Sequence, residues 1–341
     1  MSTGSAPRWV ISLAATAAER GPLFRMQPPQ LSVVIPVYNE EEGLAALFAR
    51  LYPALDALGF GYEVIFVDDG SRDRSAAILR AQFEQRPETT RVVLLAGNFG
   101  QHPAILAGFA HCRGERVVTL DADLQNPPEE IGKLLAAMDR GADYVGGVRR
   151  QRQDSWLRRL PSRLMNRLRE RITRIRMTDQ GCMLRAYSRE VIDALNRCRE
   201  TNTFVPALAY TFARRPEEVE VAHEERAAGT SKYSLFKLVA LNFDLMTGFS
   251  IAPLQFFSVL GMLIAAGSVL LYVVVITERM LLAGSLHDAL AALWDRDILA
   301  YFLIGLQLFG IGLLGEYIGR IYEEVRQRPR YVVSAVLQRE E

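Results

Sequence analysis

The sequence predicts an α/β domain with a mostly parallel sheet, followed by a pair of membrane-spanning helices. Short β-branched runs alternate with helical patterns along the N-terminal part of the chain, and this alternation produces a parallel sheet covered on both faces. Two long runs without charged residues follow towards the C-terminus, and polar or acidic residues end each strand. These observations outline the domain, its attachment to a membrane and the place of its site.

The strands and helices are predicted in order along the chain. The first strand, Leu31–Val37, precedes a helical pattern with leucines on one face. The same criteria predict strands at Tyr62–Val67, Arg91–Leu95 and Arg116–Leu120, and helices at Ser75–Gln85 and His102–Cys112. Ligands of such sheets bind at the carboxyl ends of the strands. We therefore expect the functional site at this edge.

Two apolar runs predict a transmembrane hairpin over residues 251–318. Ile251–Ile276 and Ile298–Leu314 contain no charged residue, and a helix needs roughly 20 apolar residues to cross a bilayer. The second run reaches this length only if Glu316 lies near the interface. Arginines are frequent before the first run and in the tail at residues 319–341. The positive-inside rule therefore places the N-terminal domain and the tail in the cytoplasm.

Two amphipathic segments are expected to lie on the membrane surface. Residues 235–250 carry leucines and aromatic residues opposite Lys237 and Asp244, a pattern typical of an interfacial helix. A helix packed on the sheet would show the same pattern. Trp156–Ile175 has an apolar residue at every fourth position among many arginines, which suits anionic headgroups or a lipid phosphate. A solvated face is the alternative for this segment.

Composition argues against several other classes of protein. The 341 residues include 40 Lys+Arg and 39 Asp+Glu, whereas a nucleic-acid binder usually carries a basic excess. Three cysteines without a CxxC pair are expected to be core thiols and not zinc ligands. Met1–Gln30 lacks the features of a secretory signal, so we treat it as an N-terminal extension without an assigned function. Translation from Met26 is an alternative.

An acidic pair after the fourth strand predicts a metal site. Asp121 and Asp123 are separated by one residue, so their carboxylates can reach a common point while Ala122 faces away. Two hard oxygen ligands suit Mg²⁺ or Mn²⁺, which share their other positions with phosphate and water. Acidic pairs in loops are often merely solvated, but Asp68 and Asp69 end a second strand at the same edge.

Three motifs carry a resemblance to a known family. They are Val34–Glu41, Val67–Ser71 and Leu120–Glu129. Residues 31–234 resemble the inverting glycosyltransferases of family 2, which have the GT-A nucleotide-sugar-binding fold. Together with the hairpin they resemble the branch that acts on polyprenyl phosphates, which includes dolichol-phosphate mannose synthases and bactoprenol glucosyltransferases.

The resemblance implies roles for individual residues of the site. Those implied to bind the nucleotide are Pro36, Tyr38, Glu40, Val67, Asp69, Asp121 and Gln125. Asp121 and Asp123 would bind the metal, and Asp123 would be catalytic through it. Those implied to face phosphates or the acceptor are Arg149, Arg226 and Lys232, the last two beside a Gly-Thr-Ser loop that suits closure over anions. Asp179, where relatives carry a carboxylate near the acceptor, would be a catalytic base or orienter, or a structural residue.

Further motifs resemble members of this branch that transfer 4-deoxy-4-formamido-L-arabinose from UDP to undecaprenyl phosphate. They are Asn98–His102, Arg152–Trp156, Gln180–Tyr187 and Gly312–Tyr322. The resemblance implies lipid A modification, polymyxin resistance, a bacterial inner-membrane location with membrane lipids as partners, and a homo-oligomer. Transfer of glucose or mannose to a polyprenyl phosphate is the alternative. A processive polysaccharide synthase is disfavoured because the sequence has no Gln-x-x-Arg-Trp motif.

The acceptor would bring its own nucleophile to this reaction. A phosphate monoester has a second pKa of about 6, so the lipid phosphate is a dianion at neutral pH and needs no strong base. Joining two anions is the harder task, and it requires a metal, arginines and accurate positioning. We accordingly expect His102, His111 and His223 to be structural.

Overall fold

The computed structural model describes residues 29–149, 175, 177–198, 200, 204–224, 247, 251–281 and 296–339. The N-terminal extension and the two expected interfacial segments lie almost entirely outside the described residues. Arg226 and Lys232, both expected to face phosphates, also lie outside them.

A single sheet forms the body of the described domain. Its strands lie in the order β7-β5-β6-β4-β1-β2-β3-β8. The strand bounds are β1 Leu31–Val37, β2 Tyr62–Asp68, β3 Thr90–Leu95, β4 Arg116–Thr119, β5 Tyr144–Arg149, β6 Arg185–Ser188, β7 Pro216–Val221 and β8 Val333–Leu337. The four predicted strands, β1 to β4, are parallel, whereas β6 and β8 run antiparallel to their neighbours. The predicted mostly parallel sheet is confirmed, and β5 to β8 were not anticipated.

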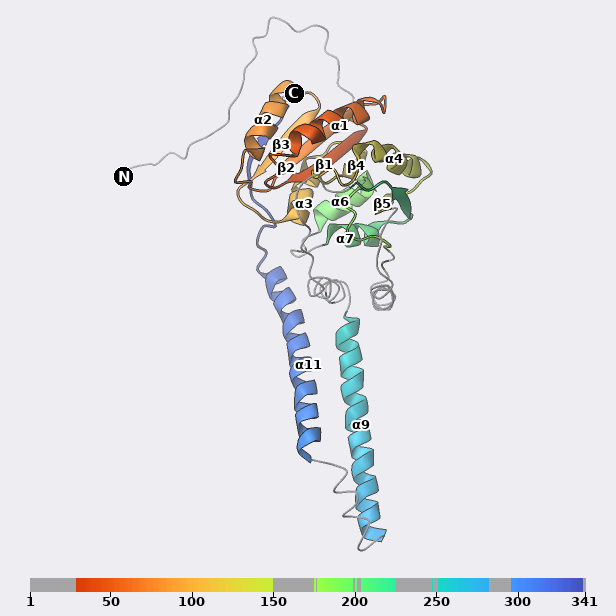
Figure 1. Cartoon of the computed structure of the whole chain (residues 1–341). Helices are drawn as coiled ribbons and strands as arrows, with labels where there is room; N and C mark the ends of the chain where they lie inside the picture. The colour runs from red at the N-terminus through yellow and green to blue at the C-terminus, as the bar shows by residue number, and fades with distance from the viewer. Residues whose placement is uncertain are drawn as a thin grey trace, which may run out of the picture.

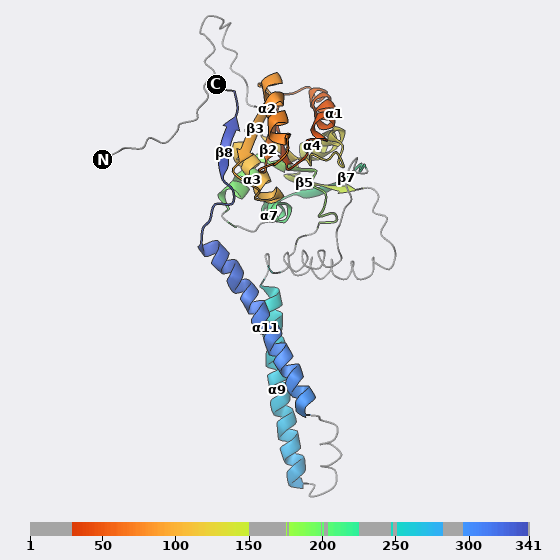
Figure 2. The same cartoon turned by 60° about the vertical axis from the view of Figure 1, so that its left-hand side comes forward.

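Helices cover both faces of this sheet (Figure 1). α1, α2 and α4 pack on one face and α3, α6 and α7 on the other, as Figure 2 also shows for α1, α4 and α7. Their bounds are α1 Leu44–Asp56, α2 Ser75–Gln85, α3 Gln101–His111, α4 Ile131–Asp139, α6 Arg189–Arg197 and α7 Val205–Phe212, with a short 3₁₀ turn η1 at Pro128–Glu130. The result is a three-layer domain with a hydrophobic core on each side of the sheet.

The first strand shows why both faces had to be covered. Val33 and Ile35 of β1 lie in one core and Val34 lies in the other, all with no exposed surface. Side chains alternate between the two faces of a strand, so a continuous β-branched run supplies both cores. α3 approaches β1 closely at Gly108, where a built Cβ would lie 2.3 Å from Cγ1 of Val34.

Replacing Gly108 with alanine is expected to lower the free energy of unfolding by about 1–3 kcal/mol, because the added methyl overlaps Val34. Gly132 in α4 is the matched control, since its nearest neighbour would be Leu58 Cδ2 at 3.9 Å. There, alanine should leave stability unchanged or raise it by about 0.5–1 kcal/mol. Chemical or thermal unfolding followed by circular dichroism checks both variants. Equal effects of Gly108→Ala and Gly132→Ala would contradict the close approach.

Two long helices project from the domain side by side (Figures 1 and 2). α9 spans Ala252–Leu281 and α11 spans Arg296–Val325. They contact each other through Phe257 and Phe309, whose ring centroids are 5.7 Å apart. Within the described residues, no helix combines the length and the apolarity that crossing a bilayer requires.

The chain returns to the sheet after α11. β8 pairs antiparallel with β3, and the hydroxyl of Ser334 donates a hydrogen bond of 2.9 Å to the carbonyl of Leu94. The expected C-terminal tail thus contributes an edge strand to the domain. The chain leaves the domain before α9 and rejoins it after α11, so the two helices form a long excursion from one folded unit.

Candidate functional site

The carboxyl ends of β1, β2 and β4 meet at one edge of the sheet. β1 lies between its two parallel neighbours, with Val37 opposite Asp68 and Val34 opposite Thr119. Two main-chain hydrogen bonds continue this pairing past the strand ends, from Asp69 to the carbonyl of Val37 at 2.8 Å and from Leu120 to that of Val34 at 3.1 Å. The structure therefore brings the residues after the three strands together, as the sequence predicted.

The loops after β1 and β2 are tied to each other by side-chain hydrogen bonds. The amide of Asn39 donates to the Ser71 hydroxyl at 3.0 Å, and its side-chain oxygen accepts from the amide of Arg72 at 2.8 Å. The amide of Glu40 donates to the Ser75 hydroxyl at 2.9 Å. Asn39 has φ +54°, a conformation that asparagine tolerates better than most residues. The ring of Tyr38, which directly precedes Asn39, is exposed.

Asp69 fastens the start of α3 to the end of β2. Its two carboxylate oxygens accept hydrogen bonds from the amides of Phe99 and Gly100, at 2.7 and 2.8 Å. Burial raises the pKa of Asp69, while these two bonds oppose the shift. The adjacent Gly70 has φ +68°, and a Cβ there would lie 2.5 Å from the carbonyl carbon of Gly97. This carboxylate is therefore a local anchor as well as a predicted nucleoside ligand.

Val67 has no exposed surface and packs in the core beneath α3. The side chain of Val67 therefore cannot contact a nucleoside. The role that the resemblance implies for Val67 is limited to its backbone. Pro36, by contrast, is half-buried and Tyr38 is exposed at the same edge.

The turn after β4 holds the predicted acidic pair. Oδ1 of Asp121 accepts a 2.7 Å hydrogen bond from Nε2 of Gln101, and Oδ1 of Asp123 accepts one of 3.1 Å from the amide of Gln125. Ala122 between them is buried, as expected. Leu124 has φ +58°, a conformation that is costly for a leucine and is often found at functional turns.

This donor set fits a divalent cation that shares its coordination with a ligand. Among the described residues, no group of three or more His, Cys, Asp or Glu side chains is placed to hold a metal. Asp121 and Asp123 alone offer two hard oxygen donors, both half-buried. Mg²⁺ and Mn²⁺ are commonly bound by one or two carboxylates together with phosphate oxygens and water, so the pair fits such an ion in the presence of a diphosphate.

A second set of contacts encloses the turn. The amide of Glu224 donates to the carbonyl of Gln125 at 2.9 Å. Arg50 of α1 donates to Glu224 at 2.8 and 3.0 Å and to Glu129 at 3.1 and 3.0 Å. Arg50 thereby links α1, η1 and the end of the described segment at residue 224. Multidentate arginine–carboxylate pairs hold geometry better than single ion pairs do.

Arg149 and Asp179 form a partly buried ion pair. Nε and Nη2 of Arg149 donate to the two carboxylate oxygens of Asp179, at 2.6 and 2.8 Å. Asp179 is 4% exposed, and its Oδ1 also accepts from the amide of Gly181 at 3.1 Å. Hydrogen bonding to Asp179 raises the pKa of Arg149. A carboxylate engaged in this way suits the orienting or structural alternative for Asp179 better than that of a general base.

Comparisons with known proteins bear on this arrangement. Residues 32–195 match the family described as Glycosyl transferase family 2. The undecaprenyl-phosphate 4-deoxy-4-formamido-L-arabinose transferase of Sodalis glossinidius (strain morsitans) is 49% identical over 312 residues, covering 92% of this chain and 95% of that protein. The protein of the same name from Edwardsiella ictaluri (strain 93-146) is 50% identical over 308 residues, covering 90% and 94%. The chain belongs to glycosyltransferase family 2.

Solved structures similar to this glycosyltransferase are more distant. Glucosyl-3-phosphoglycerate synthase from Mycobacterium tuberculosis, in complex with Mn²⁺, UDP and phosphoglyceric acid, is 20% identical with a TM-score of 0.46, covering 64% of this chain and 76% of that chain. S. aureus TarS 1-349 in complex with UDP-GlcNAc is 17% identical with a TM-score of 0.39, covering 64% and 71%.

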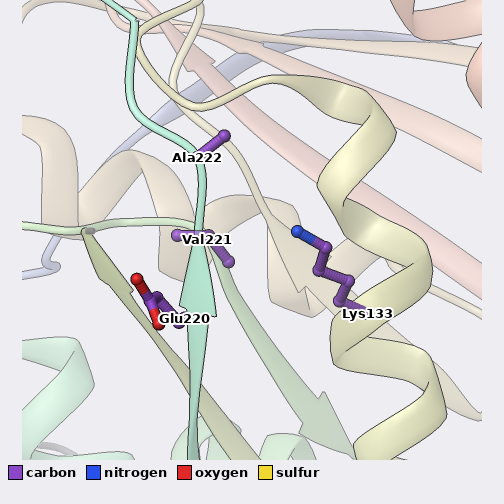
Figure 3. A pocket seen from close by; sticks show the side chains of 4 residues that line it. All are labelled: Lys133, Glu220, Val221 and Ala222. Carbon is purple, nitrogen blue, oxygen red and sulfur yellow. The ribbon is translucent and has the colours of Figure 1, made fainter.

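The glycosyltransferase also has a cavity of about 250 Å³ between α4 and β7 (Figure 3). It is lined by Lys133, Glu220, Val221 and Ala222. Two of these residues also share a partner, since Glu130 accepts hydrogen bonds from Lys133 Nζ at 2.6 Å and from the amide of Ala222 at 3.2 Å. No predicted site residue lines this cavity, although Val221 and Ala222 lie at the carboxyl end of β7.

Several residues of the glycosyltransferase site were missed at the level of sequence. Arg50 and Ser75 lie in no motif that marks them, and Ser71 ends a family motif without having been given a role, because these roles depend on which loops the fold brings together. Gln101 lies in a motif that resembles the family, but only the structure shows its contact with Asp121.

His102, Cys112 and Cys182 fit structural roles, whereas Cys198 is only half-buried and is not the core thiol that was expected. His102 packs edge-on against Phe204 with ring centroids 5.0 Å apart, and burial lowers its pKa to about 4. Cys112 and Cys182 are buried free thiols, as expected, and burial raises the pKa of each to about 11. Thiols with such pKa values are poor nucleophiles at neutral pH.

Stability should depend on pH through His102. Its pKa is 6.5 when unfolded and about 4 when folded, so the unfolded state binds more protons between these values. Wild type should therefore lose about 1–3 kcal/mol relative to His102→Gln as pH falls from 6.5 to 4, and none above that window. Unfolding midpoints of both proteins between pH 4 and 7.5 test this. Parallel curves for the two proteins would show that His102 does not titrate on unfolding.

Proposed function

We propose that this glycosyltransferase transfers 4-deoxy-4-formamido-L-arabinose from a UDP donor to undecaprenyl phosphate, with inversion at the anomeric carbon. The supporting observation is about 50% identity to proteins of that name along more than nine tenths of their length. Such transfer would serve lipid A modification and polymyxin resistance. Transfer of glucose or mannose to a polyprenyl phosphate is the second candidate, because the identity of the sugar rests on this similarity alone.

The proposed metal ligands are Asp121 and Asp123, with Mg²⁺ or Mn²⁺ as the ion. When bound, the ion would neutralise the diphosphate and stabilise it as a leaving group. The chain's own residues prepare this site. Gln101 orients the carboxylate of Asp121, and the amide of Gln125 orients that of Asp123.

Other residues of the same edge bind the two substrates in this proposal. Pro36, Tyr38, Glu40, Asp69 and the backbone of Val67 hold the nucleoside, with Gln125 near the diphosphate. Arg149, Arg226 and Lys232 face phosphates. Asp179 orients Arg149 through their ion pair. The acceptor phosphate, a dianion near neutral pH, attacks the anomeric carbon without a strong general base.

The proposed architecture attaches a cytoplasmic domain, residues 31–234, to the bacterial inner membrane. Residues 235–250 form an interfacial helix, 251–318 a transmembrane hairpin and 319–341 a cytoplasmic tail, while residues 1–30 have no assigned role. The charge-free runs support the hairpin. So do exposed apolar side chains on both projecting helices, such as Phe256 at 70% and Leu308 at 63%. Because β8 pairs with β3 of the domain, both ends of the proposed hairpin must lie on the same side of the membrane.

A homo-oligomer is also part of the proposal. Gly315 and Gly319 lie one turn apart on α11, and a Cβ at either would meet no atom within 4 Å. A pair of small residues at this spacing allows two helices to approach closely in a membrane.

The reaction is tested with purified protein, undecaprenyl phosphate, the UDP donor and Mn²⁺, with mass spectrometry of the lipid product. Asp123→Ala should lower turnover about 10²–10⁴-fold, because a ligand of the leaving-group metal is lost. Asp139→Ala is the control, since Asp139 is a solvent-exposed acid paired with Arg116. Full turnover by Asp123→Ala would refute the metal site.

A donor panel separates the sugar candidates in the same assay. UDP-4-deoxy-4-formamido-L-arabinose, UDP-glucose and GDP-mannose are offered separately with the lipid acceptor. A product formed efficiently only from glucose or mannose would replace the first proposal by the second.

The hairpin is tested by cysteine labelling. Ser285→Cys lies between the two helices and Gln338→Cys lies after β8, where the side chain is exposed. A membrane-impermeant maleimide should label Ser285→Cys in intact spheroplasts and Gln338→Cys only after permeabilisation. The unsubstituted protein gives the background from its native cysteines. Equal labelling of both variants in intact spheroplasts would contradict the proposed topology.

A further inference from the structure

Arg185 of β6 is a fully buried cation without a carboxylate partner among the described residues. It is 1% exposed. Nη2 donates a 2.7 Å hydrogen bond to the carbonyl of Asp179, and Nη1 donates to the hydroxyl of Tyr144. Its Nε has no hydrogen-bond partner within the described part of the chain.

Such an arrangement is unfavourable for stability alone. A guanidinium stays protonated in proteins, and burying a charge that is not paired costs several kcal/mol. Space for the group comes from β5, because a Cβ at Gly146 would lie 3.1 Å from Nη1 of Arg185. An apolar side chain at position 185 would avoid this cost of desolvation. Packing alone therefore does not explain why an arginine lies here.

The partners of Arg185 connect it to the site. The residue whose carbonyl it holds, Asp179, uses its carboxylate to bind both Nε and Nη2 of Arg149. The amide of Gly181 donates to the same carboxylate at 3.1 Å. A Cβ at Gly181 would lie 2.8 Å from Nη2 of Arg149, so the loop that carries Asp179 closely surrounds the Arg149 guanidinium. Movement of the Asp179 backbone would therefore move Arg149.

We propose that Arg185 is a positioning residue that acts on the phosphate-facing Arg149 through Asp179. The hydrogen bond from Arg185 to the Asp179 carbonyl fixes the main chain of Asp179. The Asp179 carboxylate in turn fixes the orientation of Arg149. The inference rests on the proposed function in one respect, which is that Arg149 faces a phosphate of the donor or of the acceptor.

Arg185→Lys is the first test, because it keeps the charge and removes the planar fork that donates in two directions. Arg149→Lys shows which KM, for donor or for lipid, depends on Arg149. We expect Arg185→Lys to raise the same KM and to lower kcat/KM about 10–100-fold.

Arg91→Lys is the matched control. Arg91 is another buried arginine, 8% exposed, and Nη1 donates to the carbonyl of His111 at 2.8 Å. It lies at the start of β3, on the opposite edge of the sheet from the site. Its replacement should lower the unfolding midpoint comparably while changing kcat/KM by less than about threefold.

The double variant Arg149→Lys/Arg185→Lys separates positioning from structure. If Arg185 acts through Arg149, the double variant should have the same kcat/KM as Arg149→Lys alone, because the second change has nothing left to disturb. Independent, multiplicative losses would overturn the inference, and so would wild-type kinetics of Arg185→Lys or an equal kinetic loss in Arg91→Lys.

Two further outcomes are also decisive. If Arg185→Lys does not fold, Tyr144→Phe is the substitute, because it removes one acceptor of the buried guanidinium and keeps the ring. Tyr144→Phe should raise the same KM. Unchanged kinetics in that variant would overturn the inference. If wild type forms product but Arg149→Lys changes neither KM, the role of Arg149 and this inference both fail. Absence of product from wild type would instead refute the proposed function.

Discussion

The site depends on the parallel register of β1 between β2 and β4. This register places three strand ends side by side, and a polar turn follows each of them. Main-chain hydrogen bonds from Asp69 and Leu120 to β1 continue the pairing into two of these turns. Since no single turn carries enough donors for a nucleotide and a cation, the chemistry requires their juxtaposition. Covering helices are needed for the same reason, because a sheet with parallel strands is stable only when both faces are buried.

Side-chain hydrogen bonds fix the turns after β1, β2 and β4 relative to one another. Asn39, Ser71 and Ser75 join the first two loops, while Asp69 ties the start of α3 to β2. Gln101, brought into place by that tie, reaches Asp121 on the third turn. Asp121, one of the two proposed metal ligands, is thus oriented through contacts that begin two strands away, which limits how far the acidic turn can shift.

Much of this was open to prediction from the sequence, and the remainder has identifiable causes. The bounds of β1 and α2 followed from periodicity, because both are local patterns with clear ends. β6 has no β-branched residue, and β7 carries glutamates at an edge of the sheet, so neither gives the β-branched run that marked the first four strands. β8 was missed because its pairing with β3 depends on residues about 240 positions apart. The Arg149–Asp179 pair was missed because only the fold brings these residues, 30 positions apart, together, although both had been singled out.

The two edges of the sheet treat buried charge in opposite ways. At the amino edge, the buried carboxylate of Glu63 accepts hydrogen bonds from Ser32 and from the amide and side chain of Arg113, and it also pairs with Arg91 at 3.4 Å. That charge is fully compensated, as a structural charge should be. At the carboxyl edge, the hydrogen-bond acceptors of Arg185 among the described residues are a carbonyl and a hydroxyl, and its guanidinium lies 5.9 Å from the centroid of the Tyr144 ring. In the proposed reaction, a buried positive charge near the phosphate-facing Arg149 would lower the cost of bringing two anionic substrates together. Burying the same cation lowers the stability of the protein without substrates. Such a loss of stability is expected where a site is preorganised electrostatically for charged substrates.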